Sequence, residues 1–427
     1  MQPIQPKINQ KLLLRVAICL FLLAIFVGAF WWFKLRESDP GGYRQLNTVG
    51  WIAALETTSE GNHVVVLKGD DAGTVINQPN VKDASEDRAP VWRPDGNYVY
   101  FPSNRQSKKF TMFRWFPAPA SDAEMRSLEG LPQLSPSFLA TDSDLGEGAM
   151  GLLTAGGRVM MYDPKTPALR QVLPPPDPKL TQSNDPEAGQ VSPFETMYER
   201  FGNSFRVAKW TPDKQAVFAV MEREDGEVLI YQKLRFKTPQ EGQPIPIAQG
   251  DHIDFDIDPN TGAAYFTVEN FQWPLGDVPS DFLKNGKVMV PFRNGLAVAD
   301  FSQQHPIQWI KQSKDNQLCF GALAVAPKGD RLVTVVGPYQ GNGNMTPKAL
   351  WMLGLSGPGR GQMAQILQGE VYEPCWSPDE KKIAYAERDS KTSRPIYVLT
   401  EGSSGPERVS PADGVFGHPQ FSPQTQG

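Results

Sequence analysis

The chain has 427 residues, with 42 Lys and Arg against 47 Asp and Glu, which gives a formal net charge of −5. This near-balance excludes a nucleic-acid binder that works by bulk positive charge. An apolar content of 40% excludes a mostly disordered chain. The 39 Pro and 38 Gly predict many turns, and therefore short strands rather than long helices. With 3 Cys and 4 His, the composition argues against cysteine-rich zinc modules and against a disulfide scaffold.

The first predicted element in chain order is an uninterrupted apolar run over residues 16–33. As a helix this run is about 27 Å long, close to the thickness of the bilayer hydrocarbon. The basic residues Lys7, Lys11 and Arg15 precede it, which favours a cytoplasmic N-terminus. The sequence therefore predicts a transmembrane signal-anchor helix over residues 16–36, in contact with the lipid bilayer through residues 16–33.

This anchor divides the chain into a cytoplasmic tail (1–15), the helix, a linker (37–46) and a folded region (47–427). The alternative is a cleaved signal peptide, because residues 27–29 resemble a small-residue cleavage site. Both interpretations carry residues 47–427 out of the cytoplasm. The predicted location is the cell membrane, single-pass, with the folded region in the periplasm or the extracellular space.

Residues 47–427 repeat one phrase, in which an aromatic residue, any residue, Pro and a polar turn residue stand between two apolar runs. The clear copies contain Trp92, Pro94 and Asp95; Trp210, Pro212 and Asp213; and Trp376, Pro378 and Asp379. Weaker copies surround Pro259, Pro327 and Pro423. Proline sets φ at the first central position of a turn and Asp or Asn accepts the next geometry, so the phrase predicts strand, turn, strand.

Two further short strands follow each clear copy, which gives four strands in a period of about 45–50 residues. This period is typical of β-propeller blades. The predicted fold is an all-β, seven-bladed β-propeller, with six or eight blades as alternatives and two stacked β-sandwiches as the main rival. Inner strands are expected to begin near residues 89, 136, 205, 252, 320, 372 and 417.

The two ends of residues 47–427 are expected to share one blade. Residues 51–56, 63–68 and 73–77 supply three strands without an inner one, and residues 418–422 supply an inner strand without the other three. Joined, they close the ring and leave no open blade edge.

The W-x-P-D-G phrase, with Ser103-Asn104-Arg105 after its following strand, resembles the repeats of TolB-type propellers, also called PD40 or WD40-like. Similar repeats occur in propellers of prolyl oligopeptidase-type peptidases. The resemblance extends over nearly all of residues 47–427, with a membrane anchor in place of the N-terminal α/β domain of TolB. It implies a propeller used for protein contacts at the bacterial envelope, and it specifies no partner.

No catalytic constellation is found in the sequence. A hydrolase of the oligopeptidase class needs a G-x-S-x-G nucleophile elbow, and the chain contains no such motif. His252 and His418 each open an inner strand, so they either point to the central channel or bond a backbone group. Asp254, Asp256 and Asp258 resemble a calcium loop, but the glycine is misplaced, and an ordinary blade turn is favoured. We therefore expect no catalytic residues, no metal and no cofactor. Cys319 and Cys375 are either one disulfide or two buried thiols.

Two insertions, residues 173–204 and 270–286, are the predicted recognition segments, because loops on a rigid scaffold often carry binding. Their candidate binding residues are aromatic, as is common at binding hot spots: Phe194, Tyr198, Phe201, Phe271, Trp273 and Phe282. The alternative is that these side chains pack on a blade.

The predicted function is a non-catalytic protein-interaction platform at the cell envelope. Its partners are other envelope proteins, with no nucleic acid among them. The alternative is a propeller enzyme, or a binder of small ligands or glycans, with its site at the central channel.

Overall fold

The computed structural model describes residues 47–68, 75–77, 86–88, 90–93, 95–105, 110–117, 124–127, 151–155, 158–163, 168–175, 198, 201–202, 204–236, 242–274, 283–284, 287–288, 293–314, 318–338 and 345–423. The chain divides into two compact units, Met1–Asn47 and Thr48–Gly427. All named elements belong to the second unit, which is described here by itself. In these ranges no helix is long and apolar enough to cross a bilayer, and the apolar run 16–33 lies outside them.

The named elements are strands and one short 3-10 helix. In chain order they are β1 (Trp51–Thr58), β2 (Gly61–Lys68), β3 (Val75–Asn77), β4 (Val91–Trp92), β5 (Val99–Ser103), β6 (Thr111–Phe116), β7 (Glu124–Ser127), β8 (Gly151–Ala155), β9 (Arg158–Asp163), β10 (Ala168–Leu173), β11 (Ser204–Trp210), β12 (Ala216–Arg223), β13 (Gly226–Lys233), β14 (Ile245–Ile257), β15 (Ala264–Gln272), β16 (Leu283–Lys284), β17 (Lys287–Val288), β18 (Asn294–Ala299), β19 (Ile307–Ser313), β20 (Cys319–Val325), β21 (Arg331–Gly337), β22 (Ala349–Gly354), η4 (Gly357–Gly359), β23 (Met363–Gln368), β24 (Val371–Trp376), β25 (Lys382–Glu387), β26 (Ile396–Thr400), β27 (Glu407–Arg408) and β28 (Val415–Phe421).

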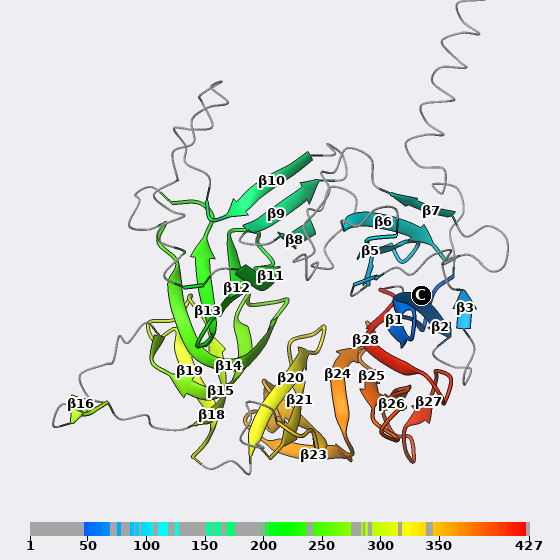
Figure 1. The fold of residues 1–427 in the computed structure, drawn as a ribbon. Helices are drawn as coiled ribbons and strands as arrows, with labels where there is room; N and C mark the ends of the chain where they lie inside the picture. Colours follow the sequence, from blue (N-terminus) through cyan, green and yellow to red (C-terminus); the bar gives the residue numbers. More distant parts are fainter. Residues whose placement is uncertain are drawn as a thin grey trace, which may run out of the picture. The chain divides into compact units, whose positions relative to one another are not determined.

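The strands form antiparallel sheets in which consecutive strands are neighbours (Figure 1). Three sheets contain four strands in chain order: β4-β5-β6-β7, β20-β21-β22-β23 and β24-β25-β26-β27. In the sheet β10-β9-β8, the expected inner strand near residue 136 lies outside the described residues. The fold is all-β, and its repeating sheet of four antiparallel strands is the unit from which propellers are built.

The pairing expected between the two ends of the folded region is present. Strand β28 pairs antiparallel with β1, from Ile52 opposite Phe421 to Thr57 opposite Val415. The resulting sheet has the order β28-β1-β2-β3. The hydroxyl groups of Thr48 and Ser422 lie 2.7 Å apart and add a buried hydrogen bond at the same junction. The inner edge of β1 is therefore paired with β28.

Two expected repeats are joined in one seven-stranded sheet, β11-β12-β13-β14-β15-β18-β19. An inner strand is expected to begin near residue 252, but β14 already begins at Ile245. Its first half pairs with β13 and its second half pairs with β15. The register shifts between Gln249 and Asp251 and again before Asp254, so β14 turns from one repeat into the next without leaving the sheet.

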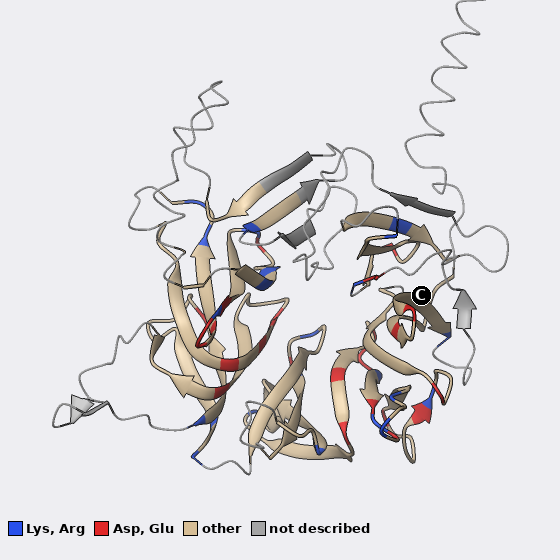
Figure 2. Ribbon diagram, in the orientation of Figure 1, with Lys and Arg blue, Asp and Glu red and all other residues tan. Residues whose placement is uncertain are grey.

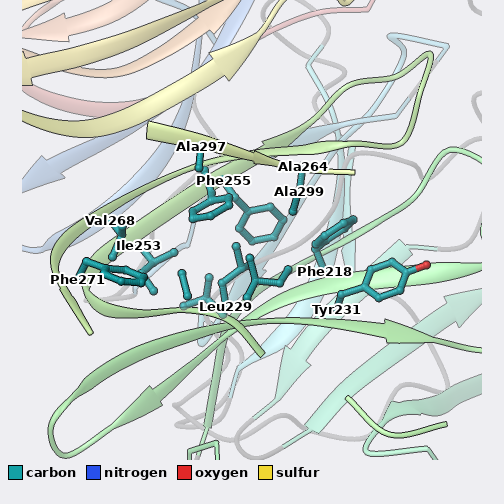
Figure 3. Packing of buried hydrophobic residues seen from close by; sticks show 14 of the residues in the cluster. Phe218, Leu229, Tyr231, Ile253, Phe255, Ala264, Val268, Phe271, Ala297 and Ala299 are labelled. Carbon is teal, nitrogen blue, oxygen red and sulfur yellow. The ribbon is translucent and has the colours of Figure 1, made fainter. Parts of the chain in front are cut away.

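A hydrophobic cluster fills the space between the two halves of this sheet (Figure 3). Phe218, Phe255 and Phe266 are each at most 1% exposed. The ring of Tyr231 stacks on Phe301 with centroids 3.9 Å apart and meets Phe218 at 5.0 Å. Aromatic pairs at these distances add to the stabilisation from burial.

The W-x-P-D turns are closed by their aspartates. In each, the carboxylate Oδ1 accepts the amide hydrogen of the residue two positions later: Asp95 from Asn97 at 3.0 Å, Asp213 from Gln215 at 3.0 Å and Asp379 from Lys381 at 3.2 Å. Pro212 and Pro378 occupy these turns, and Pro94 lies outside the described residues. The next residue is left-handed in each turn, with φ of 71° at Gly96, 56° at Lys214 and 61° at Glu380. Two copies of the turn thus hold a conformation that favours glycine.

We predict opposite effects for the same substitution at these two positions. Lys214→Gly is expected to raise the free energy of unfolding by about 0.5 kcal/mol, because relief of the left-handed strain exceeds the entropy cost of glycine. Glu380→Gly is expected to lower it by about 1–3 kcal/mol, because the 3% exposed Glu380 accepts a hydrogen bond from the Lys328 backbone and pairs with its ammonium at 3.2 Å. Urea unfolding of the two variants measures both changes. An equal effect at the two positions would contradict this explanation.

The tryptophans of these turns are buried and bind the neighbouring sheet. Trp92 Nε1 donates to the carbonyl of Gln420 at 2.9 Å, and Trp376 Nε1 donates to the carbonyl of Ala324 at 3.0 Å. Trp210 is likewise buried, at 7% exposure. The indoles of Trp92 and Trp376 each join their own inner strand to the inner strand of the preceding sheet.

The Ser-x-Arg motif forms a buried ion pair. Asp87 is fully buried, and its Oδ2 lies 2.5 Å from the Arg105 guanidinium and 3.0 Å from the Val64 amide nitrogen. The guanidinium lies over the rings of Phe101 and Phe113, at 5.3 and 5.8 Å. This pair joins the sheet that contains β2 to the sheet that contains β5.

Cys319 and Cys375, for which the sequence leaves a disulfide and two thiols open, are both free. Burial raises the pKa of Cys375 to about 11, so its sulfur stays protonated at neutral pH. We therefore assign it a packing role.

Candidate functional site at the bulge end of the inner strands

The sheets have two distinct ends. We call the end at which the inner strands begin the bulge end, and the opposite end, with the W-x-P-D turns, the turn end. Contacts between neighbouring sheets join like ends. At the bulge end, His418 N donates to Glu373 at 2.6 Å. At the turn end, Asn260 Nδ2 donates to the Lys328 carbonyl at 2.6 Å, and Lys328 in turn contacts Glu380.

Strained backbone is concentrated at the bulge end. His252 in β14, Glu373 in β24 and His418 in β28 have φ of 46°, 50° and 49°. Each lies at a register shift between the inner strand and its partner, and β11 and β20 have register shifts as well. Non-glycine residues in this conformation cost roughly 1–3 kcal/mol each and occur mainly at functional sites. This is the first reason to place the candidate site here.

Two acidic side chains bind the inner strand of the next repeat. Glu227 Oε2 accepts from Ile253 N at 2.7 Å, and Glu373 Oε2 accepts from His418 N. Carboxylates that accept backbone amide hydrogens form strong, charge-assisted hydrogen bonds. The bulged amides are thus satisfied by the preceding repeat.

The calcium-like aspartates serve the same purpose. Asp254 Oδ2 accepts from Leu323 N at 3.0 Å and Asp256 Oδ2 from Val325 N at 2.9 Å. Asp258 instead closes its own turn, where it accepts from Asn260 N at 2.9 Å. Three carboxylates with separate partners do not converge on one ion, and the described residues contain no group of three or more metal-ligating side chains.

The two histidines singled out from the sequence are exposed and belong to the bulges. His418 Nε2 lies 3.4 Å from Glu373 Oε1, and its backbone amide is bound by the other oxygen of the same carboxylate. His252 occupies the equivalent bulge in β14. Both therefore lie at the same end of their inner strands, beside acidic groups.

Glu269, near the end of β15, is the most perturbed carboxyl group at this end, and sequence reasoning missed it. It is 2% exposed and lies directly opposite Asp251 of β14. Burial, and then the charge of Asp251, raise the pKa of Glu269 to about 8. Asp251 accepts a hydrogen bond from Asn270 Nδ2 at 2.6 Å, and Asn270 is itself left-handed with φ of 48°. The available sequence signal was an acidic residue within the alternating strand 264–272.

Both predicted insertions join the sheets at the bulge end. The first lies between the end of β10 at Leu173 and the start of β11 at Ser204, and the second follows β15, which ends at Gln272. The first connection leads into β11, which begins its repeat at the bulge end. The second leaves β15, which runs antiparallel to β14 and therefore ends where the second half of β14 begins, at the same end. The described strand ends from which the two predicted recognition segments leave thus lie at one end of their sheets.

The aromatic residues predicted to bind a partner are mostly buried. Tyr198, Phe201 and Phe271 are 2%, 5% and 4% exposed. Tyr198 donates to Gln232 at 2.7 Å, and its ring meets those of Phe201 and Phe205.

Phe271 lies within β15, which continues to Gln272, and it packs edge-on against the half-buried Trp273 and Trp309. Phe194 and Phe282 lie outside the described residues. Tyr198, Phe201 and Phe271 thus pack in the sheet cores, as in the alternative given from the sequence, and binding through these residues stays a prediction.

Comparisons with known proteins agree with the fold. No family model and no curated protein matches the sequence. Among solved structures, TolB from Acinetobacter baumannii matches with 10% identity and a TM-score of 0.45 over 87% of this chain and 66% of that one. The β-propeller domain of Cps50 (Swd1) from Myceliophteria thermophila matches with 10% identity and a TM-score of 0.42, over 76% and 86% of the two chains.

A prolyl endopeptidase matches with 11% identity and a TM-score of 0.46, over 85% of this chain and 48% of its own. This chain thus spans about two thirds of the TolB chain and about half of the peptidase chain. At these identities and TM-scores we draw no functional argument from the matches. The chain is similar in fold to TolB and WD40 β-propellers, as the W-x-P-D repeats indicate.

Proposed function

We propose that the protein is a single-pass membrane protein whose residues 47–427 form a seven-bladed propeller outside the cytoplasm. There it acts as a non-catalytic interaction platform for other envelope proteins, anchored in the bilayer through residues 16–33. Its net charge of −5 argues against nucleic acid as a partner bound through bulk positive charge.

One observation carries the proposal of a platform. The left-handed residues of the inner strands, the exposed histidines and the roots of both insertions are all at the bulge end. Rigid sheets that present loops and strained polar residues at one end are suited to bind a partner there.

Photo-crosslinking in native membranes tests this choice of face. A photoreactive residue is placed in the full-length chain at exposed positions of the bulge end, His252 or Gln272, and at exposed positions of the turn end, Lys214 or Glu401. We expect discrete crosslinked species from the first pair and none from the second. The same species from both ends, or none from either, would refute the platform at the bulge end.

The location is tested separately. A cysteine introduced at the exposed position 401 should react with a membrane-impermeant maleimide in intact cells or spheroplasts. Labelling only after lysis would contradict the proposed topology and leave the choice of binding face untouched.

A further inference from the structure

The bulge end of the seven-stranded sheet is rich in acidic groups (Figure 2). They come from the β12–β13 hairpin, the middle of β14 and the end of β15: Glu222, Glu224, Asp225, Glu227, Asp251 and Glu269. The positive groups at the same end are three arginines, Arg206, Arg223 and Arg293, and two lysines at the end of β19, Lys311 and Lys314. Positive charge is therefore in the minority here.

These arginines already have partners away from Glu269. Arg206 Nε binds Glu227 Oε1 at 2.6 Å, and Arg223 Nε binds Asp225 Oδ1 at 2.7 Å. Arg293 Nε donates to the side-chain carbonyl of Asn270 at 2.7 Å. No cation of the described residues pairs with Asp251 or Glu269.

Glu269 is the acidic group at this end whose hydrogen bonding is incomplete. Its Oε2 atom is buried and has no hydrogen-bond partner among the described residues. Half-buried Asp251 lies directly opposite Glu269 in the pairing of β14 with β15, and its negative charge acts on the Glu269 carboxyl group. Buried carboxylates are normally paired with a positive charge or coordinate a cation.

The neighbouring residues hold Asp251 in place. A Cβ atom at Gly226 would lie 2.6 Å from the Gly250 carbonyl oxygen and 3.2 Å from Asp251 Oδ1, so the β12–β13 hairpin lies tightly against Asp251. On the other side Asn270 holds Asp251 Oδ2 at 2.6 Å. The oxygens of Asp251 are thus fixed before any cation arrives, which lowers the entropy cost of binding.

We propose that Asp251 and Glu269 form a binding site for one compact cation, either a hard metal ion such as Ca²⁺ or the ammonium group of a partner's lysine. Both ligands share the same chemistry, because each is a small cation that carboxylate oxygens bind. The site is separate from the choice of binding face above, and it can exist whether or not that face recruits a partner.

Thermal unfolding of the full chain in detergent tests the site. Four probes are compared at equal ionic strength and at pH 9, where Glu269 is ionised: CaCl₂, MgCl₂, KCl and a penta-lysine peptide, with tetramethylammonium chloride as the reference salt. We expect at least one probe to raise Tm by about 2–4 °C, because a ligand that binds only the folded state stabilises it. A response to a metal alone identifies a metal site, and a response to the peptide alone identifies an ammonium site.

The variants Glu269→Gln and Asp251→Asn keep side-chain shape and should each abolish the shift. The matched control is Glu401→Gln, because Glu401 is 66% exposed at the turn end and should not affect the response. The proposal is overturned if no probe raises Tm in the wild type, if Glu269→Gln retains the full shift, or if the control loses it equally.

Discussion

Replacing Arg105 by methionine is expected to lower the free energy of unfolding by about 3–5 kcal/mol. The substitution keeps the apolar stem over Phe101 and Phe113 and removes the guanidinium 2.5 Å from Asp87. Asp87 is fully buried and would retain the Val64 amide as its hydrogen-bond donor, without a positive charge. An uncompensated buried carboxylate is among the costliest defects in a folded protein. Urea unfolding of the variant and the wild type measures the loss.

A double variant provides the control. Asp87→Asn combined with Arg105→Met keeps an oxygen acceptor for Val64 and removes both charges, so it should recover most of the lost stability. A loss below about 1 kcal/mol for Arg105→Met alone would contradict a central role for the pair. A double variant as unstable as the two single losses summed would show that the charges do not interact.

The second large effect is a pH dependence that Glu269→Gln should remove. The pKa of Glu269 is raised from 4.5 to about 8 in the folded protein. Between these values the folded state holds a proton that the unfolded state has lost, so stability falls as pH rises. The contribution of Glu269 to the free energy of unfolding should be at its maximum below about pH 4.5. By pH 9 the wild type should have lost about 3–5 kcal/mol of that free energy. The glutamine variant cannot ionise and should lack this loss.

Urea unfolding at several pH values from 5 to 9, in metal-free buffer, measures the difference. The two proteins should be nearly equal at pH 5, and the variant should be the more stable at pH 9. Asp251→Asn serves as a second control. It removes the neighbouring negative charge, so the pH range of the loss should move downward. Parallel pH profiles for the wild type and Glu269→Gln would refute the burial of an ionisable carboxyl at this position.

Much of the sheet architecture could be predicted because the turn chemistry repeats. Pro and Asp fix the turn locally, so Trp210 and Trp376 mark the ends of inner strands wherever they occur. The pairing of β28 with β1 also follows, because the two ends have complementary sets of strands. By contrast, β14 could not be predicted as one strand, since a left-handed residue such as His252 is indistinguishable in sequence from a break between strands.

The candidate site was predicted less well, because the roles of its residues depend on their contacts with neighbouring sheets. Asp254 and Asp256 alternate like metal ligands, yet the same spacing places both on one face of β14, toward the amides of β20. Phe271 could not be assigned to a loop or a strand without knowing where β15 ends. Glu269 is ordinary in sequence, and its burial arises from the strands around it.

The pairing of β28 with β1 has a consequence for folding during synthesis on the ribosome. Thr48 and Ser422 are separated by 374 positions in the chain, so β1 to β3 are synthesised long before their fourth strand. Until then β1 presents a free edge, which is a template for pairing with other chains. Contacts of such long range slow folding and lengthen exposure to aggregation. The sheet β28-β1-β2-β3 is therefore complete only after β28 is made, and a chain interrupted before Val415 keeps the edge of β1 unpaired.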